Sequence, residues 1–166
     1  MRGRSSTILA AFKIGFRPLV LIFSAGQDKT GTYDFFRRLV FSVLIGNGDM
    51  HLKNWSLLYP DRRTPILSPA YDFVATLPNI QNDTLALSFG GSRSLTEITT
   101  EQVRRFADTA RLPASPLWPM VTEMTDRTVA ALENLDEKSL MPNEMRQAIS
   151  EQIMKVAKSI SQACTP

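Results

Sequence analysis

Residues 45–59 read IGNGDMHLKNWSLLY, and residues 66–76 read ILSPAYDFVAT. These stretches hold a carboxylate at Asp49, an amide five positions later at Asn54, and a second carboxylate at Asp72. Phosphoryl transfer needs a carboxylate that orients the acceptor hydroxyl and metal ions that neutralise phosphate charge. Magnesium takes oxygen ligands and usually only one or two protein carboxylates. The order and spacing of these three side chains therefore indicate a magnesium-dependent phosphoryl-transfer site.

Each of the three residues also has a simpler interpretation. Asp49 follows Asn47 and Gly48 and can be an ordinary turn residue, and Asn54 can bond its local backbone. Asp72 can cap a short helix. Taken singly, the simpler role is favoured for each residue. Five matching positions in order, with His51 and Lys53 between the first two, favour the site.

The stretch before this motif predicts an amphipathic helix over residues 32–45. Its apolar side chains recur at helical spacing, with Arg37 and Arg38 on the opposite, solvated side. Thr32 is expected to cap the helix and Gly46 to end it. The helix thus leads directly into the loop that contains Asp49.

Beyond Asn54 the pattern predicts a small hairpin, with strands over 55–59 and 65–67 and a turn over 60–63. A loop rich in Pro, Asn and Asp follows, and a short apolar piece over 84–89 closes at a turn formed by Gly90 and Gly91. Trp55 and Tyr71 are expected in the core.

From residue 99 onward the pattern is helical. Thr99 or Thr100 starts a helix that ends before Pro113, and Ser115 followed by Pro116 opens a second one. A third helix starts at Ser139 or Asn143, with apolar residues in register up to Ile160. The chain is therefore predicted to be mainly α, a helical bundle with a small β-hairpin at the catalytic and metal loop.

Composition excludes several classes of protein. With 166 residues and 43% apolar content, the chain can form one domain or one lobe of a larger protein. Residues 1–38 carry seven Lys and Arg against two Asp and Glu, whereas residues 39–166 carry twelve against fourteen. The net charge of +3 therefore belongs to the N-terminal segment, which argues against direct binding of nucleic acid.

Cysteine and histidine usage narrows the chemistry further. Cys164 is the only cysteine and His51 the only histidine, so the chain has no internal disulfide and no two-histidine metal motif. This usage fits a cytoplasmic protein. Lys13 and Arg17 interrupt the apolar stretch over 8–25, so no run reaches the ~20 residues of a membrane span. We expect this stretch to pack on the body or form a tail, rather than act as an export signal.

The two quoted stretches resemble HipA-type serine/threonine toxin kinases. The resemblance lies in the D-x-H-x-K-N segment over residues 49–54 and the later Y-D pair over residues 71–72. It extends from about residue 32 to at least Phe89, and the helices that follow suit the family's C-terminal lobe. It implies a protein-kinase-like C-terminal lobe over residues 32–166, preceded by a segment over 1–31 that does not match the family.

The resemblance assigns a role to each motif position. Asp49 would orient the substrate hydroxyl and accept its proton, and Lys53 would approach a phosphate or the catalytic carboxylate. Asn54 and Asp72 would hold Mg²⁺ and, together with His51, bind the ATP cofactor. His51 is interpreted as a residue that shapes the loop by packing and hydrogen bonding, rather than as an acid or a base.

Residues 1–31 are too short to form the N-terminal lobe with which such kinases hold ATP, and they contain no glycine-rich phosphate loop. The expectation is therefore a truncated or split kinase lobe that another chain completes. The alternatives are a non-catalytic fragment that binds an antitoxin or a kinase partner, and a plain interaction domain that binds magnesium incidentally. An aminoacyl-tRNA synthetase is the substrate implied for some family members, and exposed inter-lobe surface suggests a homodimer.

Overall fold

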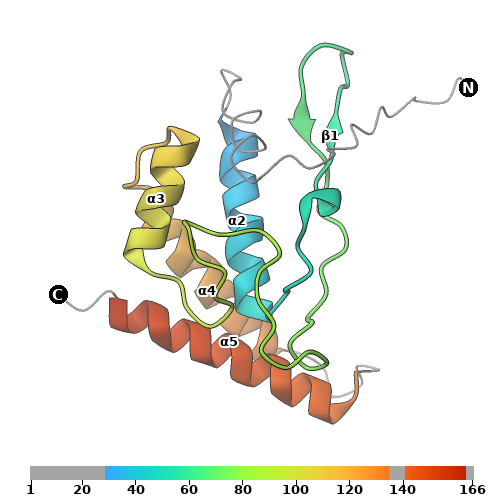
Figure 1. Cartoon of the computed structure of the whole chain (residues 1–166), viewed down its shortest axis with the longest axis vertical. Coiled ribbons are helices and arrows are strands. Elements are labelled where there is room, and N and C mark those ends of the chain that lie inside the picture. Colours follow the sequence, from blue (N-terminus) through green and yellow to red (C-terminus); the bar gives the residue numbers. More distant parts are fainter. Residues whose placement is uncertain (1–28, 135–140, 164–166) are drawn as a thin grey trace, which may run out of the picture.

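The computed structural model describes residues 29–134 and 141–163. In chain order the elements are α2 (Thr30–Ile45), a short 3₁₀ helix η1 (Leu52–Asn54), β1 (Leu57–Leu58), β2 (Ile66–Leu67), α3 (Thr100–Ala110), α4 (Leu117–Glu133) and α5 (Asn143–Ala163). Figure 1 shows this mainly helical body with the small hairpin projecting from it, which confirms the predicted fold class. The expectations for residues 1–28 and for Cys164 lie outside the described residues.

Helix α2 is the central element, and it starts earlier than predicted. Lys29 precedes its first turn, and the Lys29 carbonyl accepts hydrogen bonds from the backbone N–H groups of Thr32 and Tyr33. Thr32 is therefore not the cap; it is fully buried within the first turn. The predicted end is confirmed, because Gly46 adopts the left-handed conformation (φ 69°) that terminates helices.

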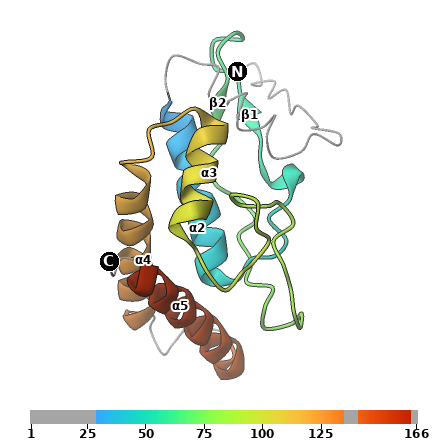
Figure 2. The ribbon, with the colours of Figure 1, turned by 60° about the vertical axis from the view of Figure 1, so that its left-hand side comes forward.

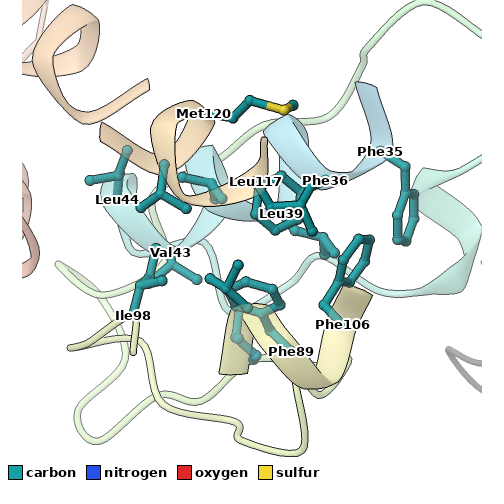
Figure 3. Close-up of a cluster of buried hydrophobic side chains, with 14 of the residues drawn as sticks. Phe35, Phe36, Leu39, Val43, Leu44, Phe89, Ile98, Phe106, Leu117 and Met120 are labelled. Carbon is teal, nitrogen blue, oxygen red and sulfur yellow. The ribbon is translucent and has the colours of Figure 1, made fainter. Parts of the chain in front are cut away.

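The hydrophobic core forms around one face of α2, which packs against α4 and α5. Phe36 and Phe106 bring their ring centroids within 4.9 Å, and Phe89 lies 6.0 Å from Phe106. Figure 3 shows these rings meeting between α2, α3 and the loop that holds Phe89. Burying each such side chain contributes about 1.5–3 kcal/mol, so this cluster ties three distant segments together.

Helices α3 and α4 follow the predicted order with one change in capping. The Thr99 side chain accepts from the backbone N–H of Gln102, whose side chain in turn accepts from the Thr99 N–H. At α4 the residue before the first turn is Pro116, and no side-chain cap bond forms there, so Ser115 is not the cap.

Helix α5 crosses the end of α2 at which the motif loop begins (Figures 1 and 2). Its residues Ile153, Val156 and Ile160 are buried as predicted. The buried Gln152 donates through Nε2 to the carbonyls of Val43 and Leu95, which joins α5 to α2 and to the loop before α3. Ser139, one of the two predicted starts of α5, lies outside the described residues, and the helix begins at Asn143.

The hairpin is shorter than predicted, and its strands pair Leu57 with Leu67 and Leu58 with Ile66. Residues 84–89 form no strand in the described structure; only Phe89 pairs with Ser92 across the predicted glycine turn. Within the described residues, no helix combines the length and apolar character needed to cross a membrane.

Candidate active-site loop

The loop after α2 presents Asp49 to solvent. The Asn47 Oδ1 accepts from the Asp49 N–H at 3.1 Å, and the Asn47 N–H donates to the Ser42 carbonyl at 2.8 Å. Asn47 is fully buried, whereas the Asp49 side chain is 59% exposed. The backbone of the loop is thus fixed from inside while its carboxylate remains accessible to another molecule.

Asn54 ends the 3₁₀ turn that follows and is 4% exposed. Its Oδ1 accepts from the His51 N–H at 3.1 Å, and its own N–H donates to the His51 carbonyl at 3.1 Å. Its Nδ2 donates to Oδ2 of Asp72 at 2.6 Å. The structure therefore brings together the two residues that the sequence assigned to magnesium.

Asp72 reaches this position from the segment after β2. Its φ of 59° lies in the left-handed region, which Asp tolerates better than most side chains. Two serines hold the strand ends beside it, because Ser56 Oγ and Ser68 Oγ are 2.9 Å apart and the Ser68 N–H donates to the Ser56 carbonyl. The hairpin thus aligns the chain that carries Asp72 with the chain that carries Asn54.

Tyr71 and Arg38 differ from their predicted roles. Tyr71 is 40% exposed rather than in the core, and its hydroxyl donates to the Lys53 carbonyl at 2.9 Å. Trp55 is buried as predicted. Arg38 is half-buried, not solvated, and donates to the Ser68 carbonyl at 2.7 Å. Burial lowers the pKa of the Arg38 guanidinium, an effect that the nearby Asp34 opposes.

The remaining motif residues are His51 and Lys53. Nε2 of His51 lies 3.8 Å from Oδ1 of Asp49, which is beyond hydrogen-bond distance. His51 contacts Asn54 through its backbone, not its ring. Lys53 is exposed, and its side chain makes no ion pair with Asp49 or any other described residue.

Two residues that sequence reasoning missed contact the loop directly before Asp49. The hydroxyl of Thr76 accepts from the Gly48 N–H at 2.7 Å and also contacts the Asp83 carboxylate. Gly48 itself was the available clue, because a glycine beside a candidate catalytic residue often marks a close approach of other atoms. Nothing in the local pattern pointed to Thr76 or Asp83 as the approaching residues.

The donor set fits a hard cation that needs few protein ligands. The described residues contain no group of three or more His, Cys, Asp and Glu side chains that could hold a metal. Magnesium usually binds through only one or two carboxylates, with water and phosphate completing its shell. Asp72 keeps one carboxylate oxygen without a hydrogen bond from any described residue, and the Asn54 Oδ1 keeps a second lone pair.

Comparison with known proteins gives a consistent result. Residues 16–134 match the family model of the HipA-like C-terminal domain. Two relatives from Sinorhizobium fredii (strain NBRC 101917 / NGR234) are named "Putative kinase": Y4dM, 47% identical over 110 residues, and Y4mE, 29% identical over 100 residues. These alignments cover 66% and 59% of this chain but only 26% and 23% of the relatives. The chain therefore spans about a quarter of the length of the curated relatives that it matches.

A solved structure shares the fold. HipA of Shewanella oneidensis MR-1, in a complex with HipB and operator DNA of its toxin–antitoxin system, superposes with a TM-score of 0.71 at 19% identity. The likeness covers 90% of this chain and 37% of that one.

Proposed function

The chain belongs to the HipA-like C-terminal domain family, and from that premise we propose that it is the catalytic lobe of a serine/threonine kinase. It transfers a phosphoryl group from ATP to a protein hydroxyl when an N-terminal lobe, on this polypeptide or another, completes the nucleotide site. The observation that carries this proposal is the 2.6 Å hydrogen bond between Asn54 and Asp72, which places an amide and a carboxylate side by side.

Asn54 and Asp72 would hold Mg²⁺ through oxygen atoms. The Asn54 amide nitrogen already engages one Asp72 oxygen, so the second carboxylate oxygen and the Asn54 Oδ1 are the groups available to the metal. Bound magnesium supplies positive charge that neutralises the phosphate oxygens during transfer.

Asp49 would act on the acceptor hydroxyl. Its carboxylate is exposed, so a serine or threonine hydroxyl from another molecule can approach and donate a hydrogen bond to it. Asp49 would then accept the hydroxyl proton as the oxygen attacks the γ-phosphorus of ATP, while the bond from that phosphorus to the bridging oxygen breaks and ADP leaves. Because the backbone of the loop is fixed, the Asp49 carboxylate would stay at the phosphate instead of moving with the substrate.

Lys53 and His51 take supporting roles in this proposal. The exposed ammonium of Lys53 has no charged partner among the described residues, so it is available to a phosphate oxygen. His51 shapes the loop through its two backbone hydrogen bonds to Asn54. It would lie beside the nucleotide when ATP is bound.

The proposed partners follow from the family and from the surface. The candidate partners are an antitoxin, an N-terminal kinase lobe on another chain, a second copy of this chain, and a substrate such as an aminoacyl-tRNA synthetase. We propose that these interactions take place in the cytoplasm. Large apolar side chains are exposed at Ile66, Val74 and Ile80, on or after the hairpin. This exposure favours a second candidate function, a non-catalytic fragment that binds a companion protein.

Titration of the chain with ATP and Mg²⁺ by calorimetry tests the first function. Asp72→Asn removes the charge but suits the left-handed backbone at this position, and Asp126→Asn, on the exposed face of α4, is the matched control. We expect binding that Asp72→Asn weakens at least tenfold and the control retains. Equal binding by wild type and Asp72→Asn would reject the metal assignment. Absence of binding in all three proteins would mean that ATP is held by another lobe or chain, or that this chain is a non-catalytic interaction fragment.

A further inference from the structure

The backbone directly before Asp49 is held by two side chains from a later loop. The Thr76 hydroxyl accepts from the Gly48 N–H at 2.7 Å and lies 3.1 Å from the Gly46 carbonyl. The same hydroxyl contacts Oδ2 of Asp83. Thr76 is thus the point at which three segments of the loop region meet.

The hydroxyl has a single proton, so it can donate to only one acceptor at a time. The Asp83 carboxylate is the stronger acceptor because it carries charge. The Gly46 carbonyl, by contrast, already accepts from the backbone N–H groups of Thr76 and Leu77. Donation to Asp83 leaves the Thr76 oxygen facing Gly48 as an acceptor.

Both ends of Gly48 are engaged by this later loop. Its N–H donates to Thr76, and its carbonyl accepts from the Ala86 N–H at 2.9 Å. Asp83 is itself fixed, because its Oδ1 accepts from the Thr84 N–H at 2.8 Å. The peptide groups on either side of Gly48 are therefore held in one orientation. This orientation sets the direction in which the next residue, Asp49, leaves the backbone.

The contact is also tight in space. A Cβ atom at position 48 would lie 2.1 Å from the Asp83 carboxylate oxygen, closer than any two such atoms can approach. Only glycine lets the loop rest against the carboxylate in this way. This closeness indicates that the loop packs directly against the Asp83 side chain at Gly48.

We infer that Thr76 and Asp83 are positioning residues that fix the direction of the Asp49 carboxylate. Neither residue is assigned contact with ATP or the substrate hydroxyl; they act through Gly48. This inference rests on the proposed function for its consequence in catalysis, whereas the positioning itself can be measured without any phosphoryl transfer.

Amide hydrogen exchange measured by NMR tests the positioning on the full chain. Thr76→Val keeps the shape of the side chain but removes the hydroxyl, Thr76→Ser retains it, and Thr109→Val removes a comparable hydroxyl from α3 as the control. We expect the Gly48 and Asp49 amides to exchange about tenfold faster in Thr76→Val. Thr76→Ser should exchange as wild type does. Exchange in Thr76→Val that matches the Thr109→Val control would overturn the inference.

A kinetic measurement with ATP on the same variants separates this inference from the proposed function. If wild type transfers phosphate, Thr76→Val should lower kcat at least tenfold with the KM for ATP unchanged, and Thr76→Ser should restore kcat. An unchanged kcat in Thr76→Val would overturn the role in catalysis even if exchange quickens. If wild type transfers none under any condition, the proposed function fails, while the exchange rates still decide whether Thr76 positions the loop.

Discussion

The side-chain amide of Asn54 donates to the Asp72 carboxylate at 2.6 Å, and the two residues come from opposite sides of the β-hairpin. Asn54 is buried and Asp72 is exposed, so the pair has a fixed inner member and an outer member that solvent can reach. A hydrogen bond to a charged acceptor is stronger than one between neutral groups. The bond therefore anchors the exposed carboxylate, which the left-handed backbone at Asp72 alone would not do.

Asp49→Asn should abolish most phosphoryl transfer. A general base contributes about 100- to 10,000-fold to a rate, and an amide cannot accept the hydroxyl proton. Initial rates with radiolabelled ATP and a hydroxyl-bearing protein substrate would measure the loss, with Asp126→Asn as the control. A rate that stays at the wild-type level in Asp49→Asn would show that another group accepts the proton.

Gly48→Ala should lower the free energy of unfolding by about 1–3 kcal/mol, because the new methyl group overlaps the Asp83 carboxylate. Urea unfolding monitored by circular dichroism would measure the change. The double variant Gly48→Ala/Asp83→Ala removes the obstacle and should recover part of the stability. Gly31→Ala, within the first turn of α2, is the control and should not destabilise the protein.

Gln152→Met should destabilise the protein by about 1–3 kcal/mol, although it preserves much of the side-chain volume. The substitution removes the side-chain N–H groups that donate hydrogen bonds to the carbonyls of Leu95 and Val43. Urea unfolding is again the measurement, and Gln147→Met on the exposed side of α5 is the control. Equal unfolding midpoints for the two variants would mean that α5 does not depend on this anchor.

The contribution of Glu101 to the stability of the folded protein should decrease as the pH falls. Hydrogen bonds from the Arg104 and Arg105 guanidinium groups lower the pKa of Glu101 from 4.5 to about 2. A lowered carboxyl pKa in the folded protein stabilises it above the ordinary pKa, and this contribution is lost as pH falls toward 2.

Thermal unfolding of wild type and Glu101→Gln over a pH series would reveal this dependence. The difference in Tm should be present at pH 7 and should shrink between about pH 4.5 and 2. Glu97→Gln serves as the control, since Glu97 is exposed and makes no hydrogen bond with a described residue. A difference for Glu101→Gln that stays constant down to pH 2 would contradict the prediction.

The elements that the sequence predicted well are those set by local chemistry. The apolar spacing of α2 and its end at Gly46 depend on neighbouring residues, as does the Thr99 start of α3. Thr32 shows the limit of such inference. Its hydroxyl suggested a cap, but packing of the helix against the body buried it in the first turn.

The residues of the candidate site also divide into those that the sequence could predict and those that it could not. The motif spacing named Asn54 and Asp72 as partners, and the structure places them in contact. The roles of Tyr71 and Arg38 could not be predicted, because each depends on a carbonyl that lies elsewhere in the chain, at Lys53 and Ser68 respectively. The contacts of Thr76 and Asp83 could not be predicted for the same reason, since they lie in a loop whose sequence has no periodic pattern.

The hydrogen bond between Asn54 and Asp72 also bears on the order in which the chain folds. It joins residues 18 positions apart, whereas the Gln152 contact with Val43 spans 109 positions. Closing the longer loop costs roughly 1.6 kcal/mol more in chain entropy. We therefore expect the hairpin to bring its two polar side chains together early on the folding pathway, before α5 docks on the end of α2.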